Sequence, residues 1–151
     1  MTFTQNQIGR SPSYGIIYLN GTTGASFSFT TSYTEITGLS ISFALSSASQ
    51  DFAMTTDGRL KYTGIPDKLF AVSANLFTVS STSPEWFSIQ IYKNGSAVSE
   101  SSIYSGTSVR VPGFSVTMST NDYLSIFTKA QAAASNIIYT AKLSATSINR
   151  V

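Results

Sequence analysis

The stretch WFSIQIYKNGSAVSES, residues 86–101, alternates large apolar and small polar side chains, and an Asn-Gly pair interrupts the alternation. Successive side chains of a β-strand point to opposite faces, so this pattern predicts a strand with one buried face. The buried parity holds Phe87, Ile89 and Ile91. The outward parity holds Trp86, Ser88, Gln90 and Tyr92. Because Asn94-Gly95 is a favoured pair for a two-residue hairpin turn, the stretch predicts a strand, a tight turn and a second strand.

The same alternation recurs through most of the chain. The stretch KLFAVSANLFTVSS places four apolar side chains on one face, namely Phe70, Val72, Ala74 and Leu76. Asp57-Gly58 lies between two short apolar segments and predicts a two-residue hairpin turn, because both residues can adopt positive φ. Pro112-Gly113 interrupts a later segment and predicts an edge strand or a crossover between sheets. About ten short antiparallel strands joined by Gly and Asn turns indicate an all-β sandwich of the jelly-roll type.

The chain is predicted to consist of an arm and one domain. Its 151 residues suit a single domain that buries roughly 70% of its unfolded surface. Residues 1–13, which contain Gly9 and Ser11-Pro12-Ser13, are expected to form a flexible N-terminal arm, and residues 14–151 the jelly-roll domain. The first strand, YGIIYLN, is expected to end at Asn20-Gly21. The segment TKAQAAAS is expected to be a loop, because so short a segment rarely holds a helix without packing support.

The composition excludes several classes of partner. The chain has 27 Ser and 19 Thr against 8 Leu, which favours strands and turns over helices. Its nine basic and seven acidic residues are scattered singly, so no basic stripe could follow a phosphate backbone and nucleic acid is not an expected partner. No stretch approaches 18 consecutive apolar residues, and the N-terminus lacks a basic start followed by an apolar run. We therefore expect no membrane insertion and no signal peptide.

The residues needed for most enzyme mechanisms are missing. With no His and no Cys, the chain cannot build a Ser-His-Asp triad, a His-based zinc site or a thiolate site. A pair of carboxylates could still hydrolyse a glycoside, and the available ones are Glu35, Asp51, Asp57, Asp67, Glu85, Glu100 and Asp122. Each of these is explained equally well by a turn, a strand start or solvation, and none follows a calcium-loop spacing. The sequence also has no Gly-rich phosphate loop, so we expect no catalytic residue, no metal and no cofactor.

Five stretches in order carry a family resemblance: TTDGRLKYTG, FAVSANLFTVSS, FSIQIYKNGSAV, VTMSTNDYLSIFTK and IIYTAKLSA. They resemble the tumour-necrosis-factor-like and complement-head-like jelly rolls, of the kind found in bacteriophage and large-virus structural proteins. The matching positions are Asp57, Gly58, Tyr62, Gly64, Val72, Asn94, Gly95, Asp122 and Tyr123. The resemblance implies a sandwich that assembles as a homotrimer around a threefold axis and acts by binding, not by catalysis.

Some aromatic residues have a parity that would place them on the outer face. They are Tyr92, Tyr123, Phe127 and Tyr139, and they are candidates for the trimer interface, because large apolar groups left on a surface mark interfaces. Ordinary packing between neighbouring strands is the alternative. Trp86 is a candidate ligand platform, since an exposed ring can stack on a sugar. Its alternative role is that of a rim residue that caps the core.

These observations lead to two functional expectations. The first is a trimeric virion surface protein, a capsid decoration or a fibre or spike head, that acts in host attachment or particle structure. In this interpretation the arm docks to other virion proteins, the body faces a host glycan or protein receptor, and the chain is made in the host cytoplasm and located at the virion surface. The second is a carbohydrate-binding jelly-roll module of the lectin kind.

Overall fold

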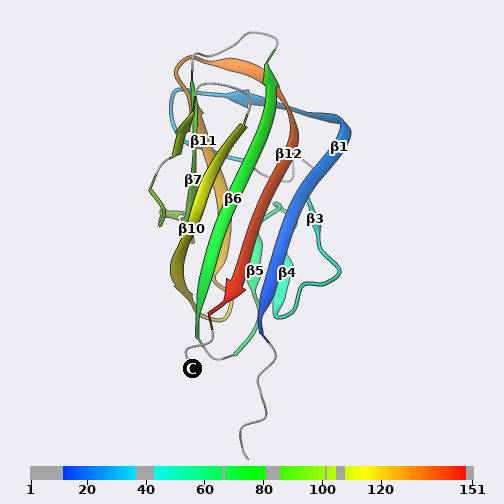
Figure 1. Cartoon of the computed structure of the whole chain (residues 1–151), viewed down its shortest axis with the longest axis vertical. Helices are drawn as coiled ribbons and strands as arrows, with labels where there is room; N and C mark the ends of the chain where they lie inside the picture. The colour runs from blue at the N-terminus through cyan, green and yellow to red at the C-terminus, as the bar shows by residue number, and fades with distance from the viewer. Residues whose placement is uncertain are drawn as a thin grey trace, which may run out of the picture.

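Two antiparallel β-sheets pack face to face in the computed structural model, which describes residues 12–36, 43–65, 67–80, 86–100, 102–104 and 108–148 (Figure 1). The five-stranded sheet holds, in spatial order, β10 (Ser108–Met118), β6 (Lys68–Ser80), β12 (Ala134–Ser147), β1 (Tyr14–Phe29) and β3 (Ala44–Leu45). The seven-stranded sheet holds β4 (Phe52–Met54), β5 (Leu60–Tyr62), β11 (Tyr123–Ala130), β7 (Phe87–Lys93) and β8 (Ser96–Ala97), with β2 (Thr34–Glu35) also paired to β11 and β9 (Ser102–Tyr104) to β7. The predicted all-β sandwich is confirmed. Within the ranges above there is no helix, and hence none that is long and apolar enough to cross a membrane.

The core lies between the sheets and follows the predicted alternation. All seven residues that the sequence assigns to the buried parity of β6 and β7 are buried, namely Phe70, Val72, Ala74, Leu76, Phe87, Ile89 and Ile91. The rings of Phe52, Tyr62 and Phe70 contact one another with centroids 5.1–5.4 Å apart. Such rings each remove a large apolar area from water, so this aromatic cluster is a main source of stability at one end of the core.

The two predicted hairpins both form, with different turns. Asn94 and Gly95 have φ of 51° and 81° and close the pair between Lys93 and Ser96, as predicted for a two-residue turn. The second hairpin joins β4 to β5, but five residues, 55–59, separate its last paired residues Met54 and Leu60 instead of the predicted two, and in this loop only Gly58 has positive φ. The cause is Thr55, whose carbonyl oxygen accepts from the Gly58 N–H at 3.0 Å and whose hydroxyl accepts from the Arg59 N–H at 3.1 Å.

The first strand does not end at Asn20-Gly21, and that prediction is wrong. β1 continues to Phe29 and pairs with β12 on both sides of an irregularity between Asn20 and Ala25. Gly24, with φ of 66°, makes this irregularity possible, because a Cβ on Gly24 would lie 2.2 Å from the Ile137 side chain. The two paired strands bend together over one end of the sandwich (Figure 1).

Two further predictions concern loops and edges. β10 is an edge strand whose register with β6 shifts between Val111 and Phe114, which confirms the effect predicted for Pro112-Gly113. The segment TKAQAAAS forms no helix. It contains the end of β11, a bend at Gln131 and Ala132, and the start of β12, so the loop is shorter than expected.

The chain enters and leaves the sandwich at the same end. Tyr14 at the start of β1 pairs with Thr146 near the end of β12. Ser13 is buried, accepts a hydrogen bond at its carbonyl from the Ser147 N–H and donates its own N–H to the Ser147 hydroxyl. Ser13 therefore belongs to the packed domain. Of the rest of the predicted arm, Pro12 is exposed and residues 1–11 lie outside the described residues.

Candidate functional site

The outer face of the seven-stranded sheet carries aromatic rings that contact one another. Tyr92 of β7 and Phe127 of β11 are stacked, with centroids 3.7 Å apart and planes 20° apart. Tyr33 lies 6.4 Å from Tyr92, and its hydroxyl is 2.8 Å from that of Ser88, which is buried. These three rings are only partly exposed, because each covers part of its neighbour.

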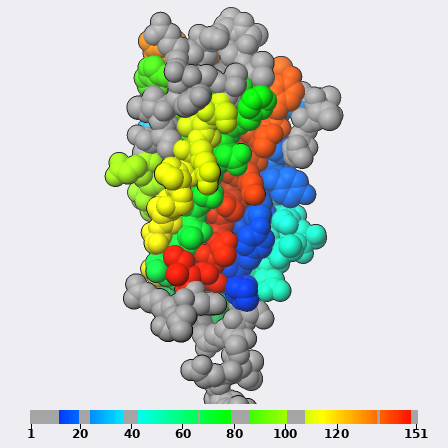
Figure 2. Space-filling model, viewed as in Figure 1, coloured from blue at the N-terminus to red at the C-terminus, as the bar shows by residue number. Residues whose placement is uncertain are grey.

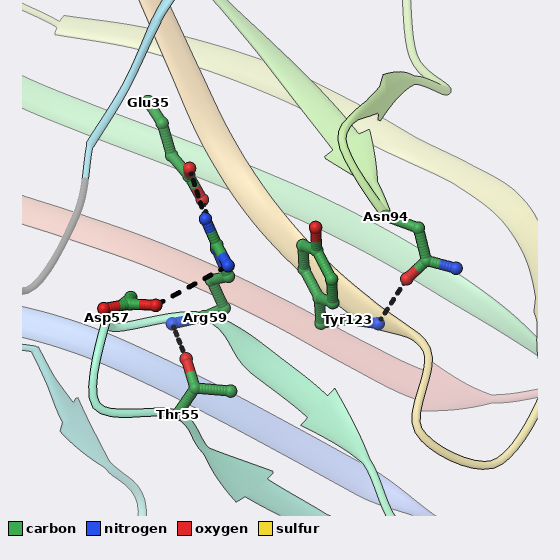
Figure 3. Close-up of polar contacts among 6 residues, drawn as sticks. All are labelled: Glu35, Thr55, Asp57, Arg59, Asn94 and Tyr123. Atoms are coloured by element: carbon green, nitrogen blue, oxygen red, sulfur yellow. Dashed lines mark hydrogen bonds and ion pairs between the residues drawn. The ribbon is translucent and has the colours of Figure 1, made fainter.

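An arginine clamp covers the middle of the same face (Figure 3). Arg59 donates two hydrogen bonds to Glu35, Nε to Oε1 at 2.7 Å and Nη2 to Oε2 at 2.9 Å. The hydrogen bonds that Arg59 donates to Glu35 raise the pKa of Arg59, although burial acts in the opposite direction. The guanidinium also lies 4.8 Å from the centroid of the Tyr123 ring. Arg59, which directly precedes β5, therefore contacts both Glu35 of β2 and Tyr123 of β11.

A second polar cluster joins the Asn94-Gly95 turn to the start of β11. Asp122 accepts from Lys93 Nζ at 2.8 Å, from Asn94 Nδ2 at 2.6 Å and from the Ser119 N–H at 2.8 Å. Burial would raise the pKa of this carboxyl, but the three hydrogen bonds outweigh burial and lower it. Asn94 Oδ1 accepts from the Tyr123 N–H at 3.0 Å. The residues that carry the family resemblance at this turn thus fix the turn itself.

Trp86 lies at the end of the sandwich away from the chain ends, where β7 begins beside the end of β11. It is half-buried, and the ammonium of Lys129 lies 5.9 Å from its ring and 4.7 Å from the ring of Tyr33. Its carbonyl oxygen accepts from the Gln131 N–H at 3.1 Å. The candidate ligand platform therefore has a neighbouring aromatic ring and a neighbouring cation.

The outer face of the five-stranded sheet, formed by β10, β6, β12 and β1, is turned toward the viewer in Figure 2. Tyr18 of β1, Phe77 of β6 and Ile137 of β12 are 40%, 37% and 40% exposed. Tyr139 lies 6.3 Å from Phe77 between ring centroids, and Gly24 leaves the room that Ile137 occupies. Unlike the rings on the opposite face, these groups expose large apolar area to solvent.

The acidic groups in the described ranges do not gather into a metal site. No set of three His, Cys, Asp or Glu residues able to hold a metal ion occurs in the described ranges. The Ser13 hydroxyl lies 2.5 Å from both Asp51 Oδ2 and Lys68 Nζ, which resembles a serine-lysine catalytic arrangement. Ser13 is fully buried, however, so this cluster fixes the entry of the chain into β1.

Comparisons with known proteins support the fold alone. No protein-family model matches the chain, and no curated protein matches it in sequence. Solved structures do match: Eiger TNF from S. frugiperda has a TM-score of 0.67 at 9% identity, over 94% of this chain and 96% of that one. Murine APRIL has a TM-score of 0.58 at 8% identity over 90% and 100% of the two chains, and the globular domain of zebrafish complement 1qA protein has 0.52 at 14% identity over 91% and 97%. The chain has a tumour-necrosis-factor-like jelly-roll fold.

This tumour-necrosis-factor-like sandwich separates the four predicted interface residues. Tyr92, Tyr123 and Phe127 lie on the seven-stranded sheet, and each contacts another side chain of the same chain. Tyr139 lies on the five-stranded sheet. The four residues therefore do not form one surface.

Sequence reasoning missed the exposed residues Tyr18, Phe77 and Ile137 on the outer face of the five-stranded sheet. Phe77 has the opposite parity to the buried residues of β6, and Tyr18 has the opposite parity to Ile17 and Leu19 of β1. An apolar residue at an outward position of a strand was the available signal. The sequence alone predicts that these side chains point outward. It does not predict that β12 lies between β1 and β6, which is the pairing that brings them to one face.

Proposed function

We propose that the chain is a non-enzymatic binding domain that assembles as a homotrimer on the surface of a virion, as a capsid decoration or as the head of a fibre or spike. The resemblance to jelly rolls of viral structural proteins and the tumour-necrosis-factor-like fold support this proposal. The buried position of Ser13 and the pairing of Glu35, Asp51 and Asp122 with cations also favour binding over catalysis.

The trimer interface is proposed to be the outer face of the five-stranded sheet. Among the described residues, three of the five exposed large hydrophobic side chains lie there, and the other two, Ile65 and Ile148, lie near the chain ends. An exposed group of this kind is stabilised when a second surface removes it from water. This placement is the observation that carries the trimer proposal.

The direction of the chain suggests how the trimer would be oriented. Because the described chain enters and leaves at one end, that end would face the particle, with the arm docked to other virion proteins. The opposite end, where Trp86 and Lys129 lie, would point toward a host glycan or protein receptor. The long axis of the sandwich would then point away from the particle surface.

Light scattering on a sizing column tests the assembly. We expect a species of about three times 16.2 kDa that persists on dilution. The double substitution Tyr18→Ser and Phe77→Ser is expected to give monomers with an unchanged circular dichroism spectrum, whereas Ile65→Ser, on an 82% exposed residue away from the face, leaves the trimer intact. A wild-type monomer, or a double variant that remains trimeric, would contradict the proposal.

A further variant tests which of the two sheets forms the trimer interface. Tyr92→Ser removes a ring that stacks on Phe127 within the chain, so it is expected to lower the melting temperature without dissociating the trimer. Dissociation by Tyr92→Ser at an unchanged melting temperature would place the interface on the seven-stranded sheet instead.

The virion role needs its own measurement. Peptides of this chain should be found by mass spectrometry in particles purified on a density gradient, and antibodies against the domain should label intact particles. Absence of the chain from purified particles would overturn the virion role and leave the trimer proposal standing.

A carbohydrate-binding module is the second candidate, and the position of Trp86 favours it. The ring is half-buried at the end away from the chain ends, next to Tyr33 and Lys129, so part of it is accessible for stacking on a sugar. Trp86→Ala should abolish binding to a glycan array at an unchanged melting temperature. A large loss of stability with no change in glycan binding would instead identify Trp86 as a rim residue.

A further inference from the structure

Two cations lie in one row across three neighbouring strands of the five-stranded sheet. Arg110 of β10 and Lys142 of β12 both pair in register with Asn75 of β6. All three side chains point outward, because the residues before and after each of them are buried in the core. Strands lie about 4.8 Å apart, so the two cations start about 10 Å from each other and their long side chains can reach the space above Asn75.

Neither cation has an anionic partner within the described part of the chain. The ion pairs formed there involve Arg59, Lys68 and Lys93, and none involves Arg110 or Lys142. No acidic residue lines the hollow between them. With only 11% charged residues in the chain, two cations on one row without a carboxylate are a distinct positive feature of this face.

The space between the cations is a hollow of about 330 Å³ lined by hydroxyl and amide groups. Besides the row itself, it is lined by Ser73, Ser108 and Ser144. The hydroxyls of Ser73 and Ser144 are 3.0 Å apart, so one donates to the other and the acceptor keeps its own hydrogen for a further bond. The Asn75 amide supplies two more donors. The hollow therefore offers positive charge and hydrogen-bond donors together.

We infer that this hollow binds an oxyanion, a carboxylate or sulfate group held between Arg110 and Lys142. Arginine presents a planar fork of donors that matches such a group, and hydrogen bonds between ionised partners are the strong ones. The group has two sources, a small free anion or an acidic side chain of a neighbouring copy. The second source rests on the proposed trimer, whose interface is this same face, whereas the first does not.

Thermal melting with sodium sulfate tests the free-anion source. At constant ionic strength, low millimolar sulfate is expected to raise the melting temperature of the wild-type chain by a few degrees relative to chloride. The double variant Arg110→Gln and Lys142→Gln should bind sulfate at least tenfold more weakly in a titration. Lys61→Gln, which removes a cation from the seven-stranded sheet, is the matched control and should respond as the wild type does.

Light scattering of the same proteins tests the neighbouring-copy source. If sulfate has no effect, the proposal requires the double variant to dissociate at a protein concentration at least tenfold higher than wild type, with Lys61→Gln unchanged. Glu100→Gln should then reproduce the defect if Glu100 supplies the carboxylate, since it is exposed and forms no ion pair among the described residues.

The outcomes separate this inference from the trimer proposal. A sulfate response that the double variant loses supports the site whether the chain is a monomer or a trimer. A trimer that shows neither a sulfate response nor a defect in the double variant overturns the site and leaves the trimer intact. A monomer without a sulfate response overturns both.

Discussion

Breaking the Arg59–Glu35 pair is expected to destabilise the outer face of the seven-stranded sheet. The pair joins Glu35 of β2 to Arg59, which directly precedes β5, and both of these short strands pair with β11 (Figure 3). The Glu35 side chain is only 16% exposed and that of Arg59 28%, so the pair is partly removed from water. Exposed ion pairs contribute about 0.2–1 kcal/mol, whereas hydrogen bonds to charged groups contribute about 1.5–3 kcal/mol. With two good hydrogen bonds and partial burial, we expect a coupling energy of about 1–2 kcal/mol.

A double-mutant cycle measures that energy. The wild type, Glu35→Gln, Arg59→Met and the double variant are unfolded in urea at one protein concentration, and the four free energies of unfolding give the coupling energy. In thermal melts of the same proteins, the melting temperature is expected to fall by roughly 2–4 °C for each kcal/mol lost in a domain of this size. Asp57→Asn is the control, because Asp57 is half exposed and 3.6 Å from Arg59, and it should change the free energy of unfolding by less than about 0.5 kcal/mol. A coupling energy below about 0.3 kcal/mol, or a larger effect of Asp57→Asn than of Glu35→Gln, would refute the reasoning.

Two further predictions concern acid stability and glycine packing. Asp122→Asn should lower the free energy of unfolding by about 1.5–3 kcal/mol at pH 7. The folded pKa of Asp122 lies below its ordinary 3.8, so the stabilisation by its carboxylate is present above that value and is lost as the pH falls through the folded pKa. The difference in the free energy of unfolding between the wild type and Asp122→Asn, measured in urea, should therefore be smaller at pH 3 than at pH 7, and an equal difference at both pH values would contradict this. Gly15→Ala should lower the free energy of unfolding by about 1–3 kcal/mol, because the new Cβ would lie 2.4–2.9 Å from atoms of the buried Phe52 side chain. Gly113→Ala is the control, since no atom lies within 4 Å of its Cβ, and it should be nearly neutral in the same urea melts. Equal effects of the two substitutions would contradict the clash.

The core and one turn could be predicted because both depend on local sequence. Alternation over seven residues is enough to orient Phe87, Ile89 and Ile91, since the period of a strand is fixed by its backbone. The Asn94-Gly95 turn is fixed by the positive φ that those two residues tolerate. These features did not require knowledge of the neighbouring strands.

The rest depended on pairing between distant segments. Asn20-Gly21 has the composition of a turn, but β12 pairs with β1 on both sides of it and keeps the chain extended. Parity correctly predicts that Tyr92 and Phe127 leave the core, but it does not reveal that each covers the other. The same limit applies to Tyr18 and Phe77, whose shared face exists only after β12 lies between β1 and β6.

The central position of β12 has a consequence for biosynthesis. Residues 134–147 are translated long after β1 and β6, yet β12 lies between these two strands and pairs with one edge of each. Until β12 emerges from the ribosome, β1 and β6 each present an open edge, and the contacts that close the sheet span more than a hundred residues. Completion of the fold is therefore delayed until β12 has been translated. Exchange of β12 between nascent copies is the assembly error to which this order of synthesis exposes the protein.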